Sequence, residues 1–305
     1  MTRRHQRVSL ESLRLLDAID RHGSFAAAAQ ELCVVTSSIT HAVRNLEENL
    51  GLTLFDRSGR SARFTTKGRS LLDSGRPLME RAAAFDAHVQ LIATGWEPLL
   101  VLSLDEVIPM KPLVPLLRAF FEAAPQTSVQ VRREAVAGSW DALMSGRADL
   151  VVGAPAGGPA GGGFECAPLW QLEFVLAAPP DHPLAGRSGS ISNAEIAQYR
   201  AVVLGDTTRS LPHLSYGLLD NSLQLSMPDH GAKLEAILQG IGCGFLPRGM
   251  AQPHVDAGRL VLLQAETPLP PSQSTVAWRA GETGRALRWW IDHLTDPSWA
   301  QGVFA

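Results

Sequence analysis

Residues 24–57 read SFAAAAQELCVVTSSITHAVRNLEENLGLTLFDR, and this stretch decides the fold of the first part of the chain. Ser24 is a suitable N-cap for the alanine-rich run that follows it, which has a high helix propensity. Residues 33–35 interrupt that run, after which Thr36 or Ser37 can cap a second helix that ends at Gly51. The pattern predicts two helices joined by a tight turn, followed by the first strand of a hairpin.

The second of these helices is amphipathic. Its apolar residues are spaced i, i+4, i+7 and i+11 and form one face: Ile39, Val43, Leu46 and Leu50. The opposite face carries Ser37, Thr40, His41, Arg44 and Glu48. Such a face suits the major groove of DNA, where short polar side chains contact base edges and cations contact phosphates. Periodicity alone, however, favours an ordinary solvent-exposed helix that covers a core.

A β-hairpin is predicted next, over residues 53–66, where LTLF and ARFT flank a turn that contains Gly59. Arg57, Arg60 and Arg63 lie on or near its tip. Three cations beside an exposed polar helix could contact DNA phosphates. On the residues alone, this interpretation and that of an ordinary solvent-exposed turn are about equally favoured. Before this region, residues 9–22 predict a first helix with one buried stripe.

The segments SFAAAAQEL and SSITHAVRNLEENLGLTLFDRSGRSARFTTKG resemble the N-terminal domain of LysR-type transcriptional regulators, most specifically at LEENLGLTLFDR and RFTTKG. The resemblance implies a winged helix-turn-helix over residues 1–66 that binds double-stranded DNA. It assigns base contacts to Thr36, Ser37, Ser38, Thr40 and His41, and phosphate contacts to Arg44, Arg57 and Arg60. The family often has Gln, Pro and Arg where Thr36, Ser37 and His41 stand here. Because the Arg would be a strong guanine reader, we expect a different operator preference.

Charge is distributed unevenly along the chain. Residues 1–70 hold eleven Lys and Arg against seven Asp and Glu, a net charge of +4, whereas the whole chain has −3 and the remainder therefore −7. A basic head neutralises phosphate, and an acidic body keeps the molecule away from nonspecific polyanions. The 305 residues, 45% of them hydrophobic, are enough for two or three globular domains.

Residues 67–95 predict a long linker helix with a heptad pattern. Leu71, Leu78, Phe85 and Ile92 recur every seven residues, and Val89 belongs to a second seam position that is otherwise filled by Gly75 and Ala82. A seam of this kind requires a partner helix, so we expect dimerisation through Leu71, Leu78, Phe85, Val89 and Ile92. Pro77 lies inside this helix and predicts a kink or a break.

After residue 95, short apolar strands alternate with amphipathic helices, which predicts mostly parallel sheets covered by helices. The layout, with the segments DLVVGAP, HPLA, GIGCGFLP and GRLV, resembles the effector domain of the same family. The resemblance implies an α+β and α/β multidomain chain whose two-lobed, periplasmic-binding-protein-like domain closes on a small molecule. Lobe I would span residues 96–164, with residues 267–305 returning to it, and lobe II residues 165–266. GGPAGGG at 157–163 favours a flexible crossover over a phosphate loop.

A ligand site is expected where the carboxyl ends of the strands of the two lobes meet. The candidate residues there are Ser103, Asp105, Arg132, Trp140, Ala154, Thr207, Thr208, Arg209 and Pro228. Each also has an ordinary structural interpretation, such as a cap, a surface ion pair or a core position. An acid at Asp105 argues against a simple carboxylate effector unless Arg209 or Arg132 compensates.

Other classes of protein fit less well. No G-x-S-x-G, Walker A, H-E-x-x-H or C-x-x-C motif is present, so we expect no enzyme, catalytic residue, metal site or cofactor other than an effector of unknown identity. Cys33, Cys166 and Cys243 lack metal-ligand spacing. A redox switch between the last two is conceivable, but buried structural thiols are commoner. No apolar run could span a bilayer and no signal peptide is evident, which opposes a solute-binding transport protein and fits a reducing cytoplasm.

The sequence thus predicts a LysR-type regulator that binds an imperfect palindromic operator. Its partners would be DNA, a second copy of itself, and RNA polymerase at the promoter. The resemblance further implies a tetramer built as a dimer of dimers. Effector binding would change the spacing of the DNA-binding heads and hence the bend of the DNA, which costs on the order of a few kcal/mol.

Overall fold

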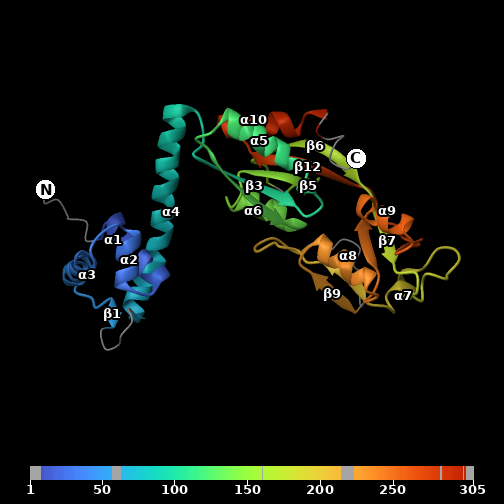
Figure 1. Ribbon diagram of the computed structural model, residues 1–305, viewed down its shortest axis with the longest axis horizontal. Coiled ribbons are helices and arrows are strands. Elements are labelled where there is room, and N and C mark those ends of the chain that lie inside the picture. Colours follow the sequence, from blue (N-terminus) through green and yellow to red (C-terminus); the bar gives the residue numbers. More distant parts are fainter. Residues whose placement is uncertain are drawn as a thin grey trace. The chain divides into compact units, whose positions relative to one another are not determined.

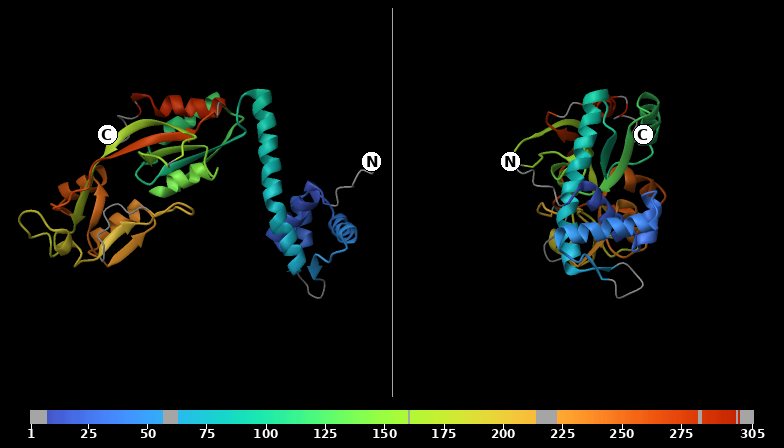
Figure 2. Two further views of the ribbon diagram at one scale, coloured as in Figure 1. Left: turned by 180° about the vertical axis from the view of Figure 1, so that it is seen from behind. Right: turned by 90° about the vertical axis from the view of Figure 1, so that its left-hand side faces the viewer.

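The computed structural model describes residues 8–56, 63–159, 161–213, 223–281, 284–297 and 299. The chain forms two compact units, Met1–Val89 and Gln90–Ala305. The first holds three short helices, a small hairpin and most of one long helix. The second holds two α/β lobes (Figures 1 and 2).

The first unit begins with α1 (Leu10–His22), α2 (Phe25–Glu31) and α3 (Thr36–Leu50). Ser24 caps α2 as predicted, because its hydroxyl accepts a 3.1 Å hydrogen bond from the backbone N–H of Ala27. The N-cap of α3 is Val35, which has no polar side chain, so the predicted cap at Thr36 or Ser37 is wrong. Strands β1 (Phe55–Asp56) and β2 (Arg63–Phe64) form an antiparallel hairpin.

Helix α4 (Thr66–Thr94) is anchored on α1 through its first half. A Cβ atom at Gly75 would lie only 2.4 Å from Cδ2 of Leu13, so glycine permits the two helices to approach closely. Arg69 and Arg76 reinforce the contact, with N–O distances of 2.7 Å from each guanidinium to the carboxylate of Asp20. The apolar core of this unit is formed by α1–α3, the hairpin and Leu72 of α4.

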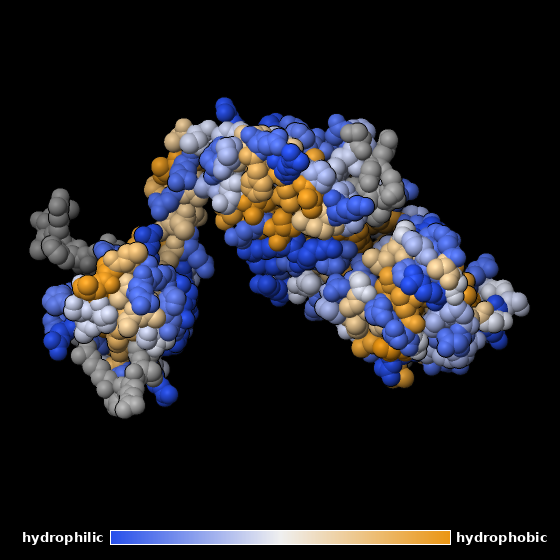
Figure 3. Space-filling model, in the orientation of Figure 1, coloured by the Kyte–Doolittle hydropathy of each residue, from blue (hydrophilic) through white to orange (hydrophobic). Residues whose placement is uncertain are grey.

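From Leu78 onward, α4 exposes apolar side chains. Leu78, Phe85, Val89 and Ile92 are all exposed, and Figure 3 shows apolar surface along this helix. Leu71 differs from them, because it packs against the core of the first unit. Its predicted place in the dimer seam stays a prediction. The helix continues through Pro77, so the predicted break does not occur.

Lobe I contains a five-stranded sheet in the order β4-β3-β5-β12-β6. Strands β3 (Leu99–Asp105), β4 (Ser128–Glu134) and β5 (Leu150–Pro155) are parallel, whereas β12 (Ser272–Arg279) runs antiparallel to β5 and β6 (Phe164–Leu172). Helices α5 (Leu113–Ala123) and α10 (Arg285–Leu294) cover one face, and α6 (Ala137–Met144) covers the other (Figure 1).

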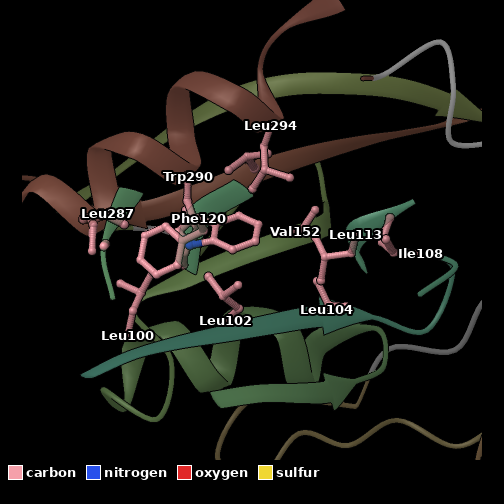
Figure 4. Close-up of a cluster of buried hydrophobic side chains, with 14 residues drawn as sticks. Leu100, Leu102, Leu104, Ile108, Leu113, Phe120, Val152, Leu287, Trp290 and Leu294 are labelled. Atoms are coloured by element: carbon pink, nitrogen blue, oxygen red, sulfur yellow. The ribbon is translucent and has the colours of Figure 1, made fainter. Parts of the chain in front are cut away.

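Successive side chains of β3 point alternately to these two faces of the sheet. Leu100, Leu102 and Leu104 pack against α5 and α10, where Phe120 and Trp290 fill the centre of the core (Figure 4). The intervening residues Ser103 and Asp105 consequently face α6. They are the buried polar groups on that side of the strand.

Lobe II is built from a β10-β7-β11 sheet and a β8-β9 pair. Its strands are β7 (Phe174–Ala178), β8 (Ala201–Leu204), β9 (Gln224–Met227), β10 (Gly244–Pro247) and β11 (Val261–Leu263). A parallel bridge between Ala201 and Cys243 connects the two sets of strands. The helices of the lobe are α7 (Asn193–Ile196), α8 (His230–Leu238) and α9 (Arg248–Asp256).

Two elements of this unit differ from the sequence prediction. The resemblance predicts that residues 165–172 belong to lobe II, but β6 pairs with β12 and belongs to the sheet of lobe I, so the boundary follows Leu172. This strand lies at the edge of its sheet and contains Pro168, which obscures a strand pattern. Helix α9 was also missed, because Pro253 stands inside it.

Candidate functional site

The exposed face of α3 carries every polar residue that was predicted to contact DNA from this helix. Ile39, Val43 and Leu46 are buried, whereas the opposite face is solvent-exposed and consists of Thr36, Ser37, Ser38, Thr40, His41 and Arg44. The hydroxyl of Thr40 donates to the carbonyl oxygen of Thr36 at 3.0 Å, and a side-chain nitrogen of Asn45 lies 3.1 Å from His41 Nδ1. These local bonds orient two of the candidate readers without covering them.

The hairpin is held against α3 by Glu47. Its carboxylate accepts hydrogen bonds from the backbone N–H groups of Leu54 at 2.7 Å and Phe55 at 3.2 Å. This contact fixes where the hairpin leaves the helical core. Arg63 is exposed on β2, whereas Arg57 and Arg60, predicted to contact phosphates, lie outside the described residues.

A cavity lies between the two lobes of the second unit. Lobe I contributes Asp105, Val107, Val136, Gly153 and Pro155, and lobe II contributes Leu204, His230, Lys233 and Phe245. Leu172, Phe174, Ser272 and Ser274 line it where β6 passes into β7 and where β12 begins. The cavity therefore adjoins both connections between the lobes.

Asp105 is the carboxylate in this cavity. Its oxygens accept a 2.9 Å hydrogen bond from the Ser139 hydroxyl and a 3.2 Å bond from the N–H of Val107. Burial raises the pKa of this carboxyl to about 7, although these hydrogen bonds act in the opposite direction. Val136 lines the same wall with φ of 58°, a strained backbone conformation for a β-branched residue, and such strain is concentrated at functional sites.

Lys233 and His230 face the cavity from α8 and were missed as site residues. Both are buried, because β8 and β10 pack against the helix. Burial lowers the pKa of Lys233 to about 8. Burial, with the cations Lys233 and Arg133 contributing, lowers the pKa of His230 to about 3, and its Nδ1 has no hydrogen-bond partner among the described residues. The sequence places the two residues three positions apart, one helical turn, which was the available sign.

Most of the predicted ligand contacts lie elsewhere. Arg132 is exposed and bonds to the backbone of Arg147, and Pro228 is also exposed. Trp140 is core, with its Nε1 donating to the carbonyl of Pro155, and Ala154 is a buried sheet residue. Ser103 is fully buried, and within the described part of the chain its hydroxyl has no hydrogen-bond partner. Of the nine predicted residues, Asp105 is the one that the lining of the cavity includes.

The other three predicted residues lie in the segment of lobe II that contacts lobe I, and two of them make the contact. The hydroxyl of Thr207 donates to the Glu134 carboxylate and accepts a 2.9 Å hydrogen bond from the N–H of Ala135. The backbone N–H of Arg209 donates to Asp141 at 3.1 Å. Thr208 is held by its own loop, because its hydroxyl accepts a bond from the N–H of Leu211. Thr207 and Arg209 thus fasten the 205–211 segment of lobe II to the end of β4 and to α6 of lobe I.

The three cysteines are free: Cys33 and Cys166 are exposed and Cys243 is buried, so the general expectation of buried thiols holds for one of them. Burial raises the pKa of the Cys243 thiol to about 11. Among the described residues, no group of three or more His, Cys, Asp or Glu side chains is placed to hold a metal ion. Nor does any described helix have the length and apolarity needed to cross a membrane.

A winged helix-turn-helix joined to a two-lobed α/β domain with a cavity between its lobes defines a transcriptional regulator with a ligand-binding domain. Comparison with known families agrees with this class. Residues 10–69 match the bacterial regulatory helix-turn-helix protein, lysR family, and residues 93–297 match the LysR substrate binding domain. The chain therefore belongs to the LysR family of helix-turn-helix transcriptional regulators.

Individual relatives support this assignment over nearly the full length. The uncharacterized HTH-type transcriptional regulator YeeY of Escherichia coli K12 is 36% identical over 298 residues, 97% of this chain and 96% of that protein. The HTH-type transcriptional regulator PunR of the same strain is 32% identical and covers 93% and 92%.

Solved structures share the fold. The Vibrio cholerae virulence activator AphB superimposes with a TM-score of 0.57 at 18% identity, covering 94% of this chain and 98% of AphB. CbnR, crystallised with its target DNA, gives a TM-score of 0.58 at 19% identity, covering 94% of this chain and 99% of CbnR.

Proposed function

We propose that this protein binds a specific double-stranded DNA operator through α3 and regulates transcription in response to a small molecule. The observation that carries the proposal is the two-sided character of α3. Its apolar face is buried in the helix-turn-helix core, and its exposed face holds hydroxyl groups, an imidazole and a guanidinium. These groups match the base edges and phosphates of a major groove.

Two chains would act together through α4. Leu78, Phe85, Val89 and Ile92 form one exposed apolar stripe, which a second α4 would cover. A pair of heads would then bind the two halves of an imperfect palindrome, with a dimer of dimers as the larger assembly and RNA polymerase as the promoter partner. Pairing increases affinity because the second head binds as an intramolecular event.

The effector would occupy the cavity between the lobes. A ligand that bridges the lobes selects one angle between them, and its binding free energy can therefore shift the arrangement of the heads on DNA. We propose no catalytic residue, metal or cofactor. Its relatives YeeY and PunR are HTH-type transcriptional regulators, and a regulator of this kind would act in the cytoplasm, where its DNA is.

The decisive test uses short duplexes tiled over the DNA upstream of the protein's own gene. Fluorescence anisotropy measures the binding of the protein to each duplex at two salt concentrations. One duplex should bind far more tightly than its neighbours, with a steep salt dependence. His41→Ala and Arg44→Ala should each weaken that binding by about 1–3 kcal/mol. Arg118→Ala, an exposed cation on α5, serves as the control and should leave affinity unchanged. Full affinity of both α3 variants would refute the assignment of α3.

A further inference from the structure

Two opposite charges face the same cavity from different lobes. Asp105 lies at the end of β3 in lobe I, and Lys233 lies on α8 in lobe II. Each is only 4% exposed. In the part of the chain that the structure describes, neither forms an ion pair with the other or with any third residue. Both groups are therefore available to a molecule in the cavity.

The surroundings hold each group in place, and no described side chain of opposite charge pairs with it. Ser139 and the N–H of Val107 orient the carboxylate of Asp105, but no cation among the described residues pairs with it. The stem of Lys233 passes beside Gly244, where a Cβ atom would lie 3.4 Å from Lys233 Cε, and its ammonium has no hydrogen bond to any described residue. Burying uncompensated charges costs free energy, which a ligand with matching charges would recover.

The rest of the wall is mostly apolar. Val136, Leu204, Phe174 and Phe245 line the cavity, and the hydroxyls of Ser272 and Ser274 add a polar edge. Such a wall accommodates an aliphatic or aromatic body, while a small number of polar groups fix the orientation of the ligand. The lining of the cavity thus combines a carboxylate from one lobe, an ammonium group from the other and a mostly apolar wall.

We propose that the effector is a small zwitterion with an apolar body, an amino acid or a close analogue. Its ammonium group pairs with Asp105, and its carboxylate pairs with Lys233. This inference rests on the proposed function of the cavity as the effector site. The arrangement also rejects competitors, because a simple carboxylate meets the Asp105 charge and a simple amine meets Lys233. The two ends of one ligand bind different lobes, so occupancy holds the lobes together.

The test uses the full-length protein and isothermal titration with α-amino acids of both hands and with β-, γ- and ω-amino acids. The strongest binder is then compared with its two singly charged analogues, the amine without the carboxylate and the acid without the amine. For leucine these are 3-methylbutylamine and 4-methylpentanoate. We expect each analogue to bind at least tenfold more weakly than the zwitterion. Equal binding of either analogue, or no binding by any zwitterion, would overturn the inference.

Variants of Asp105 and Lys233 test whether these two residues bind the charged groups of the ligand. Asp105→Asn and Lys233→Met should each weaken zwitterion binding at least tenfold. Asp181→Asn and Lys111→Met, which remove exposed charges of the same kinds, should not. Unchanged binding by both cavity variants would also overturn the inference. Operator binding measured in parallel separates the two hypotheses: a protein that binds its operator but no zwitterion retains the proposed function and loses only this effector class.

Discussion

The hydroxyl of Thr207 accepts a 2.9 Å hydrogen bond from the backbone N–H of Ala135 and donates to the carboxylate of the adjacent Glu134. One small side chain of lobe II therefore bonds to two groups of lobe I. Glu134 is also paired with Arg147, whose guanidinium reaches Asp141 at 2.7 Å. The contact between the lobes is thus a nearly buried polar network, and its members depend on one another.

Thr207→Val should loosen this contact, because it leaves the Ala135 N–H without its acceptor and removes one of the two side-chain donors to the Glu134 carboxylate, the other being Arg147. The expected loss is about 1–3 kcal/mol for the unsatisfied buried groups. Native-state hydrogen exchange at the Ala135 amide reports it directly. Thr207→Ser keeps the hydroxyl and is the matched control. If the valine and serine variants exchanged at the same rate, the hydroxyl would not hold the lobes together.

The pH dependence of the protein's stability should reveal the raised pKa of the Asp105 carboxyl. Its pKa is raised from 3.8 to about 7 in the folded protein, so between these values the folded state keeps a proton that the unfolded state has lost. Stability is therefore lost as pH rises through this window. Asp105→Asn removes this pH-dependent contribution to stability. The melting temperature of the variant relative to wild type should therefore rise from pH 4 to pH 7 and then level off.

Between pH 4 and pH 7, the difference in unfolding free energy between Asp105→Asn and wild type should change by on the order of 2–4 kcal/mol. His230 and Lys233, which face the same cavity, titrate in both proteins and so cancel in the comparison. Thermal unfolding at half-unit pH intervals measures the difference, with the exposed Asp181→Asn as the control. A difference between Asp105→Asn and wild type that stays constant across the window would contradict the raised pKa.

The sequence predicted the exposed face of α3 because the helix is amphipathic and its environment follows from periodicity alone. Lys233 and His230 were not recognised because their burial depends on how β8 and β10 pack against α8, a tertiary property. Arg132 and Trp140 were placed at the cavity by their strand and helix positions. Their side chains instead satisfy local hydrogen bonds to the backbone of Arg147 and Pro155. Strand ends locate a site, but side-chain direction decides which residues reach it.

Gly68→Ala should destabilise the first unit. A Cβ atom at this position would lie 2.2 Å from the carbonyl oxygen of Leu54, and a backbone atom cannot move aside easily. Alanine gains up to about 1 kcal/mol in helix propensity, but overpacking typically costs about 1–3 kcal/mol, so we expect a net loss. Scanning calorimetry should show a lower transition temperature for the first unit of Gly68→Ala than for that of the wild type. Ser70→Ala, exposed on the same helix, should not lower it, and a wild-type transition in Gly68→Ala would show that the helix can shift without cost.

The last prediction concerns the exposed stripe on α4. Phe85 and Ile92 are 66% and 72% exposed and seven residues apart, as expected of two seam residues whose partner helix belongs to another chain. Phe85→Glu combined with Ile92→Glu places like charges at the proposed seam. Sedimentation at micromolar concentration should then show monomers, and operator affinity should fall at least tenfold because two linked heads no longer bind together. Gln90→Glu, an exposed change on the same helix, should alter neither quantity. If the double variant kept both its mass and its affinity, the chains would have to associate through a different surface, and the stripe would need another occupant.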